Sequence, residues 1–154
     1  MANNPPPYTR QAFAEWATNR STHAVTLNAD RELTERRMRE IFGTFCHNAD
    51  RLILRRRNVR NVPGDQRLFG IAYPENLGTN AHLHCAFDFA ALVNLVGDGK
   101  SLEHKVELLW NAAAHRAGTV CVKPLTSAGW AYYASKSAHR HDPLYFLPAD
   151  YHRS

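Results

Sequence analysis

The chain has 154 residues, 44% of them hydrophobic, which suffices for one domain with a core of its own. Nineteen Lys and Arg against 14 Asp and Glu give a formal net charge of +5, which favours a polyanionic partner such as nucleic acid. The three cysteines are far apart in apolar or helical runs and do not indicate a disulfide framework. No apolar run reaches the length of a membrane span, and residues 1–7 lack a signal-peptide pattern. We therefore expect a cytoplasmic protein without membrane contacts.

The first third of the chain predicts an extension, a strand and a long helix. Residues 1–21 are expected to form an N-terminal extension with a short helix that carries Phe13 and Trp16. Residues 22–28 alternate as in a strand. Asp30 can cap a helix whose apolar residues recur at spacings of three and four: Met38, Ile41, Phe42, Phe45, Ala49 and Leu52.

Residues 68–89 predict two strands joined by a turn. The first is expected over 68–73, stopped by Pro74, and residues 76–80 have the composition of a hairpin connection. The second covers 81–89, where side chains alternate between two faces of a strand. Leu83, Cys85, Phe87 and Phe89 would enter the core, while His82, His84, Ala86 and Asp88 would share the opposite face.

The second half of the chain predicts a further strand between two helices. Residues 90–99 are ambiguous between a helical turn and a loop. Ser101 is expected to cap a helix that ends at Gly118, followed by a strand over 119–123 and a third helix from Thr126 or Ser127. Residues 139–154 would form a tail that packs on the core through Tyr145, Phe146 and Leu147. The order β-α-β-β-α-β-α predicts an α+β, ferredoxin-like (split βαβ) antiparallel sheet with helices, its core spanning residues 22–138.

His82 and His84 form a candidate metal site. Residues two apart on a strand have Cα atoms about 6.5 to 7 Å apart, so both imidazoles can meet one ion. Glu75, at the end of the preceding strand, could complete a two-histidine, one-carboxylate site with open positions. The ligand types leave zinc, manganese and magnesium open. The alternative is a pair of surface histidines and a solvated glutamate.

Tyr132, Tyr133 and Lys136 form a second candidate group on the predicted third helix. Lys136 shares a helical face with either tyrosine, but adjacent tyrosines point about 100° apart, so only one can be a nucleophile. A nearby cation would favour the phenolate or neutralise charge on a phosphate. The alternative is an amphipathic helix with aromatic core contacts and a surface lysine.

Arginines concentrate after the first long helix. Arg55, Arg56, Arg57, Arg60 and Arg67 could follow a nucleic-acid backbone, or form a solvated charge run.

Taken in order, these motifs resemble the HUH endonucleases, the replication initiators and relaxases that nick single-stranded DNA. The run from His23 to Asn28 is similar to the first-strand motif of that family, although Asn28 replaces its usual closing residue. His82-Leu83-His84 is similar to the metal motif, and Tyr133-Ala134-Ser135-Lys136 to the Tyr-x-x-Lys motif of single-tyrosine initiators. Glu75 stands where many initiators place a third metal ligand.

The resemblance implies a metal-dependent nicking and rejoining enzyme of the HUH type, with a 5′-phosphotyrosine intermediate. Tyr133 would be the nucleophile, assisted by Lys136, and Mn²⁺ or Mg²⁺ would be the cofactor. Contacts to single-stranded DNA or a DNA hairpin are expected from Thr26, Asn28, Arg55, Arg56, Arg57, Arg60 and Tyr132. With no helicase region in the sequence, a host helicase would unwind the duplex. The rival classes are a non-catalytic nucleic-acid-binding module on a ferredoxin-like fold and a small zinc-dependent hydrolase.

Overall fold

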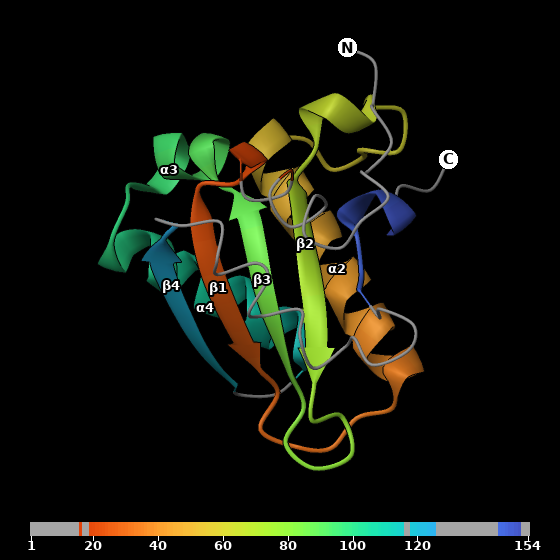
Figure 1. Ribbon diagram of the computed structural model, residues 1–154. Coiled ribbons are helices and arrows are strands. Elements are labelled where there is room, and N and C mark those ends of the chain that lie inside the picture. The colour runs from red at the N-terminus through yellow and green to blue at the C-terminus, as the bar shows by residue number, and fades with distance from the viewer. Residues whose placement is uncertain (1–15, 17–18, 116–117, 126–144, 152–154) are drawn as a thin grey trace.

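One antiparallel sheet with helices over one of its faces makes up the protein, as seen in a computed structural model that describes residues 16, 19–115, 118–125 and 145–151 (Figure 1). The elements are β1 (His23–Asn28), α2 (Glu35–Leu54), η1 (Gly64–Gln66), β2 (Phe69–Glu75), β3 (His82–Asp88), α3 (Ala90–Val96), α4 (Lys100–Ala114), β4 (Thr119–Pro124) and η3 (Pro148–Tyr151). Among these helices, none combines the length and the apolar character needed to cross a membrane.

The four strands are ordered β2-β3-β1-β4, with every neighbouring pair antiparallel. β1 and β2 are therefore parallel to each other, with β3 inserted between them, and α2 makes the connection behind the sheet (Figure 1). This arrangement confirms the predicted α+β class and antiparallel sheet, and it is consistent with a ferredoxin-like fold. The predicted third helix lies outside the described residues, as does Phe13 of the predicted short helix.

The core lies between the sheet and α2 and α4. Its largest fully buried side chains are Trp110, Phe42, Phe45, Phe87, Phe89, Phe146, Leu27, Met38, Ile41, Leu83 and Leu92, whereas the equally buried Ile71 packs on the other face of the sheet. The predicted alternation along β3 is confirmed, because Leu83, Cys85 and Phe87 are fully buried whereas His82 and His84 are partly exposed on the other face. Burial raises the pKa of the Cys46 and Cys85 thiols well above their ordinary value.

The start of α2 corrects one prediction. Thr34, not Asp30, caps this helix, and its hydroxyl accepts a hydrogen bond from the Arg37 backbone N–H at 3.0 Å. The chain before Thr34 is held against the β2–β3 connection, since the Arg31 carbonyl accepts from Ala81 at 2.9 Å and Leu33 donates to Leu77 at 2.8 Å. Those bonds keep residues 31–33 out of the helix.

Pro74 does not end β2, which continues to Glu75. β2 is an edge strand, and its residue Ala72 pairs outward with Phe146, through bonds of 3.0 and 2.8 Å. Pro74 lies two residues further on and faces the same way, so its missing N–H removes no bond to β3. β2 is therefore long enough to include Glu75 within the sheet.

The boundaries of α4 also differ from the prediction. The helix follows Gly99, so Ser101 lies inside it rather than at its cap, and it ends at His115, which adopts a left-handed conformation with φ 54°. Gly118 lies beyond the helix. The segment over 90–99, which the sequence left ambiguous between a helical turn and a loop, contains α3. Gly118 serves a close approach instead, because a Cβ there would collide with the Asn28 carbonyl oxygen.

Candidate metal centre

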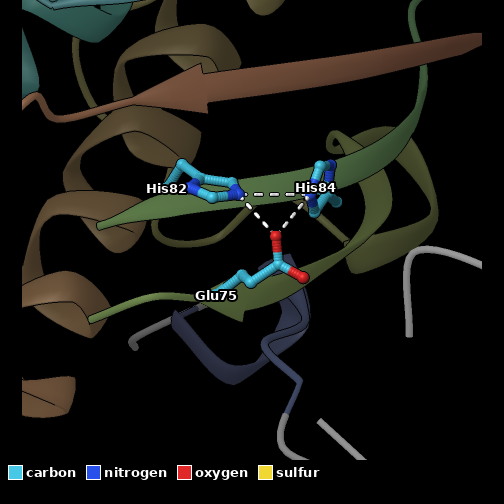
Figure 2. Close-up of side chains that lie close together, drawn as sticks. All are labelled: Glu75, His82 and His84. Carbon is cyan, nitrogen blue, oxygen red and sulfur yellow. Dashed lines mark hydrogen bonds and ion pairs between the residues drawn. The ribbon is translucent and has the colours of Figure 1, made fainter. Parts of the chain in front are cut away.

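Glu75, His82 and His84 come together on the face of the sheet opposite α2 and α4, which we call the open face because no helix of the described residues covers it. In the β2–β3 ladder Glu75 is directly opposite His82, and Tyr73 is opposite His84. Side chains of directly paired residues lie on the same face, so all three groups project from one side. Figure 2 shows the two imidazoles, from β3, converging on the carboxylate of Glu75, from β2.

The donor atoms are close enough to bind one ion. Glu75 Oε1 lies 2.8 Å from His82 Nε2 and 3.2 Å from His84 Nε2, and the two Nε2 atoms are 3.2 Å apart. Two ligand atoms held about 2.1 Å from one ion, at tetrahedral or octahedral angles, lie about 3.0 to 3.4 Å apart. Two of the observed separations, 3.2 Å each, are of this size and the third, 2.8 Å, is slightly shorter, so the three predicted residues form a group that could hold one divalent cation.

The His82 ring is oriented by a contact with the backbone. Its Nδ1 lies 3.1 Å from the Asn80 carbonyl oxygen, which can only accept a hydrogen bond. A hydrogen on Nδ1 can donate to this carbonyl, and the ring orientation it supports directs Nε2 toward Glu75. A backbone carbonyl that orients a metal-binding imidazole in this way is a common feature of metal sites.

The triad is partly exposed, which leaves room for further ligands. The side chains of His82, His84 and Glu75 retain 14%, 25% and 28% of their exposure. Three protein ligands on an open face fit a site that binds its ion together with water or substrate. Histidine nitrogen and carboxylate oxygen suit manganese, magnesium and zinc to different degrees, so the donor set does not choose among them.

Two of the predicted DNA contacts lie beside the triad on β1. Thr26 is directly opposite His84 and Asn28 is directly opposite His82, on the same open face. The Asn28 side chain donates to Thr119 Oγ1 of β4 at 3.1 Å, while its backbone carbonyl accepts from the indole of buried Trp110 at 2.7 Å. α4 thereby fixes the end of β1 next to the candidate metal centre.

The part of the open face farther from the triad is partly covered. Ile71, Tyr73 and Ala86 pack there with Trp16, Leu125, Tyr145 and Leu147. Phe146 passes the edge of β2 and is buried on the helical side. The prediction that residues 145–147 pack on the core is therefore confirmed.

The predicted basic residues are not brought to the triad. α2 begins next to the end of β1 that carries Asn28 and runs back behind the sheet, so Arg55, Arg56 and Arg57 lie at the opposite end (Figure 1). Arg60 is exposed in the same region. These residues therefore lie away from the triad, and their predicted contact with DNA stays a prediction.

Arg67 corrects another expectation, because it is buried and takes no part in an exposed cluster. Its Nε donates to Asp50 Oδ2 at 2.9 Å, and the other carboxylate oxygen accepts from the backbone N–H of Leu68 at 2.7 Å. The side chains of Arg67 and Asp50 are 3% and 0% exposed. This ion pair joins α2 to the start of β2.

His23, in the motif on β1, faces the helical side of the sheet and not the triad. Its Nδ1 lies 2.7 Å from the Thr22 hydroxyl and its Nε2 lies 3.1 Å from Asp98 Oδ1. The Gly99 backbone N–H and the His23 ring lower the pKa of Asp98 below its ordinary value. His23 thus joins β1 to the loop before α4.

Tyr132, Tyr133 and Lys136 lie outside the described residues, so their predicted roles stay predictions. Sequence reasoning missed Asn80 and Trp110, the groups that orient His82 and Asn28. The position of Asn80 just before a histidine strand was a weak signal for the first, and nothing local indicated the second.

Comparisons of the chain with protein-family models, with curated proteins and with solved structures found no match.

Proposed function

We propose that this protein nicks and rejoins single-stranded DNA by a metal-dependent transesterification of the HUH type. The observation that supports this most directly is the Glu75, His82 and His84 triad, gathered on an open sheet face with the separations of a metal site. The order of motifs along the sequence supports it further, since the family resemblance places a tyrosine and a lysine after the metal ligands.

In this proposal the triad holds Mn²⁺ or Mg²⁺, which when bound would supply Lewis-acid polarisation of a phosphate oxygen. The Asn80 carbonyl would orient the His82 ring so that Nε2 faces the cation. The Tyr133 hydroxyl would lose its proton and attack phosphorus, and the bond from phosphorus to the 3′ oxygen would break. The products would be a 5′-phosphotyrosine and a free 3′ hydroxyl, and the reverse attack would reseal the strand. Lys136 would favour the phenolate.

The open face gives a place for the substrate strand. Thr26 is paired with His84 and Asn28 with His82 across the β1–β3 ladder. Both would contact the DNA next to the scissile phosphate. A single strand or a hairpin loop is required for the attack, so a host helicase would supply exposed DNA in a cell. The recognition sequence would depend on these flanking residues.

The test is a covalent adduct on labelled single-stranded DNA with manganese. The parent protein is expected to give a slower band on denaturing electrophoresis, and Tyr133→Phe is expected to abolish it while DNA binding persists. Tyr132→Phe is the matched control and should still form the adduct, because neighbouring helical side chains point about 100° apart. Lys136→Ala should slow adduct formation.

The same assay tests whether adduct formation depends on the candidate metal ligands. His82→Ala should lose adduct formation with the fold intact, because this side chain lies outside the core. An adduct mapped to Tyr132 would reassign the nucleophile within the same chemistry. Binding without any adduct on single strands or hairpins would refute nicking and favour a binding module.

A zinc-dependent hydrolase is the second candidate, because two histidines and a glutamate with open positions also form a zinc-hydrolase donor set. That enzyme would cleave a small substrate without a covalent protein–DNA species. Zinc-dependent hydrolysis of small esters that Glu75→Gln abolishes and Tyr133→Phe leaves unchanged would support it.

A further inference from the structure

A strongly basic surface lies at the end of α2, away from the candidate metal centre. An open cavity of about 400 Å³ is lined by Asn48, Arg51, Leu52, Arg55, Arg56 and Arg57. A smaller cavity of about 200 Å³ follows on the neighbouring side of the helix and is lined by His47, Val59, Arg60, Arg67 and Tyr151. We call the exposed basic residues of these linings the α2 basic end: His47, Arg51, Arg55, Arg56, Arg57 and Arg60.

Neither cavity has an acidic residue in its lining. Between positions 51 and 60 the sequence holds five arginines and no aspartate or glutamate. The nearest buried carboxylate, Asp50, is already engaged by Arg67 and the Leu68 backbone. The arginines at the start of α2 differ, because Arg36 and Arg37 both pair with Glu40, at 3.6 and 3.2 Å. The α2 basic end therefore offers several guanidinium groups to an external anion.

The backbone at this end also departs from the usual pattern. Arg55 is the cap residue of α2 and has φ 52° and ψ 39°, in the left-handed region where helices usually place glycine. An L residue is disfavoured there by its Cβ atom. His115 adopts the same conformation at the end of α4, so the end of α2 differs from that cap in its permanent positive charge and not in its backbone.

The surroundings favour a duplex over a single strand. Proteins that hold single strands use aromatic platforms on which bases stack, and the 400 Å³ cavity has no aromatic residue in its lining. The smaller cavity is lined by Tyr151, but that ring packs edge-on against buried Phe42, with centroids 5.7 Å apart. Consecutive arginines match instead the closely spaced phosphates of duplex DNA, about one charge per 1.7 Å of axis. A 20-residue helix is about 30 Å long, so one phosphate cannot touch both this surface and the triad.

We propose that the α2 basic end binds the phosphate backbone of double-stranded DNA, separately from the single strand at the candidate metal centre. Arg51, Arg55, Arg56 and Arg57 supply charge-assisted hydrogen bonds to phosphates, with no readout of sequence. The surface does not rest on the proposed nicking chemistry, because backbone binding requires no metal ion. In a nicking enzyme it would hold the duplex that flanks the exposed strand.

The experiment measures binding of full-length protein to a labelled random duplex of about 20 base pairs by fluorescence anisotropy, in EDTA, over about 50 to 200 mM KCl. Arg56→Gln with Arg57→Gln is the test variant, which leaves the Arg55 cap intact. It should weaken duplex binding and make the slope of log K against log salt shallower by about 1.8, at about 0.9 per lost phosphate contact. Arg36→Gln with Arg37→Gln, the same charge change at the other end of α2, should change the slope by less than half as much.

Three results would overturn the proposal. An unchanged salt slope in the test variant would show that these arginines touch no phosphate. A loss confined to a single strand of the same length would assign the surface to the substrate strand. Tighter binding of a polyglutamate chain than of the duplex would indicate an acidic protein partner. Adduct formation is read separately, so a failure of the nicking proposal leaves the duplex result interpretable.

Discussion

Removing His84 should remove most of the stabilisation by metal without unfolding the protein. A ligand that binds only the folded state at 100 times its Kd stabilises it by about 2.7 kcal/mol. For a chain of this size each kcal/mol shifts Tm by about 2 to 4 °C, so the parent should gain about 5 to 11 °C in Mn²⁺. His84 supplies one of three donors, 3.2 Å from both partners. A loss of about 100-fold in affinity would leave about 0.4 kcal/mol, or about 1 °C.

The structure predicts a small effect of His84→Ala on the metal-free protein. The side chain lies on the open face and keeps 25% of its exposure, so its removal creates no core cavity. We expect a change within about 1 kcal/mol in unfolding free energy. The assay is thermal unfolding by circular dichroism after dialysis against EDTA, with Mn²⁺ added back at a multiple of the Kd from titration calorimetry.

His104→Ala is the matched control. This histidine lies on α4, with its side chain 69% exposed and 3.9 Å from Glu107. The control should retain the full rise in Tm. An equally large rise in the His84→Ala protein would refute the reasoning and place the metal elsewhere.

Two further predictions concern buried groups. Asp50→Ala should lower the free energy of unfolding by about 3 to 5 kcal/mol in urea, because it leaves the Arg67 guanidinium buried without its carboxylate, and a loss below about 1 kcal/mol would contradict this. Iodoacetamide at about pH 8 should label exposed Cys121 in the native protein, whereas Cys46 and Cys85 should react only in denaturant, because their raised pKa keeps the thiols protonated and burial blocks access. Native labelling of either buried cysteine at the rate of Cys121 would refute the second prediction.

The grouping of the three candidate metal ligands could be predicted from the sequence because their geometry is local. His82 and His84 share a face through the two-residue period of a strand, and Glu75 reaches them across a short connection. The alternation in this segment also separated the core side chains from the open face correctly.

The errors have a common physical origin in contacts between residues distant along the chain. Asp30 resembled a helix cap, but bonds from Arg31 and Leu33 to the β2–β3 connection delay the helix to Thr34. Arg67 resembled part of a basic run, but its partner Asp50 lies 17 residues earlier on α2. No local pattern reveals such partners.

Arg55, Arg56 and Arg57 illustrate a different limit. Their charge was evident in the sequence, but their separation from the triad depends on the direction in which α2 returns behind the sheet. Charge patterns indicate the kind of partner, and only topology decides which surface meets it.

The candidate metal centre occupies a single hairpin, from Glu75 to His84. Its geometry therefore depends on the register in which β2 pairs with β3. One extra residue within the start of β3 would exchange the two faces of that strand, sending an imidazole toward the core and a leucine to the open face. A divalent cation bound by Glu75, His82 and His84 would select the correct register over its slipped alternatives, since only the correct pairing presents all three donors. The affinity for the metal ion and the fraction of molecules with the correct strand register would then report the same equilibrium.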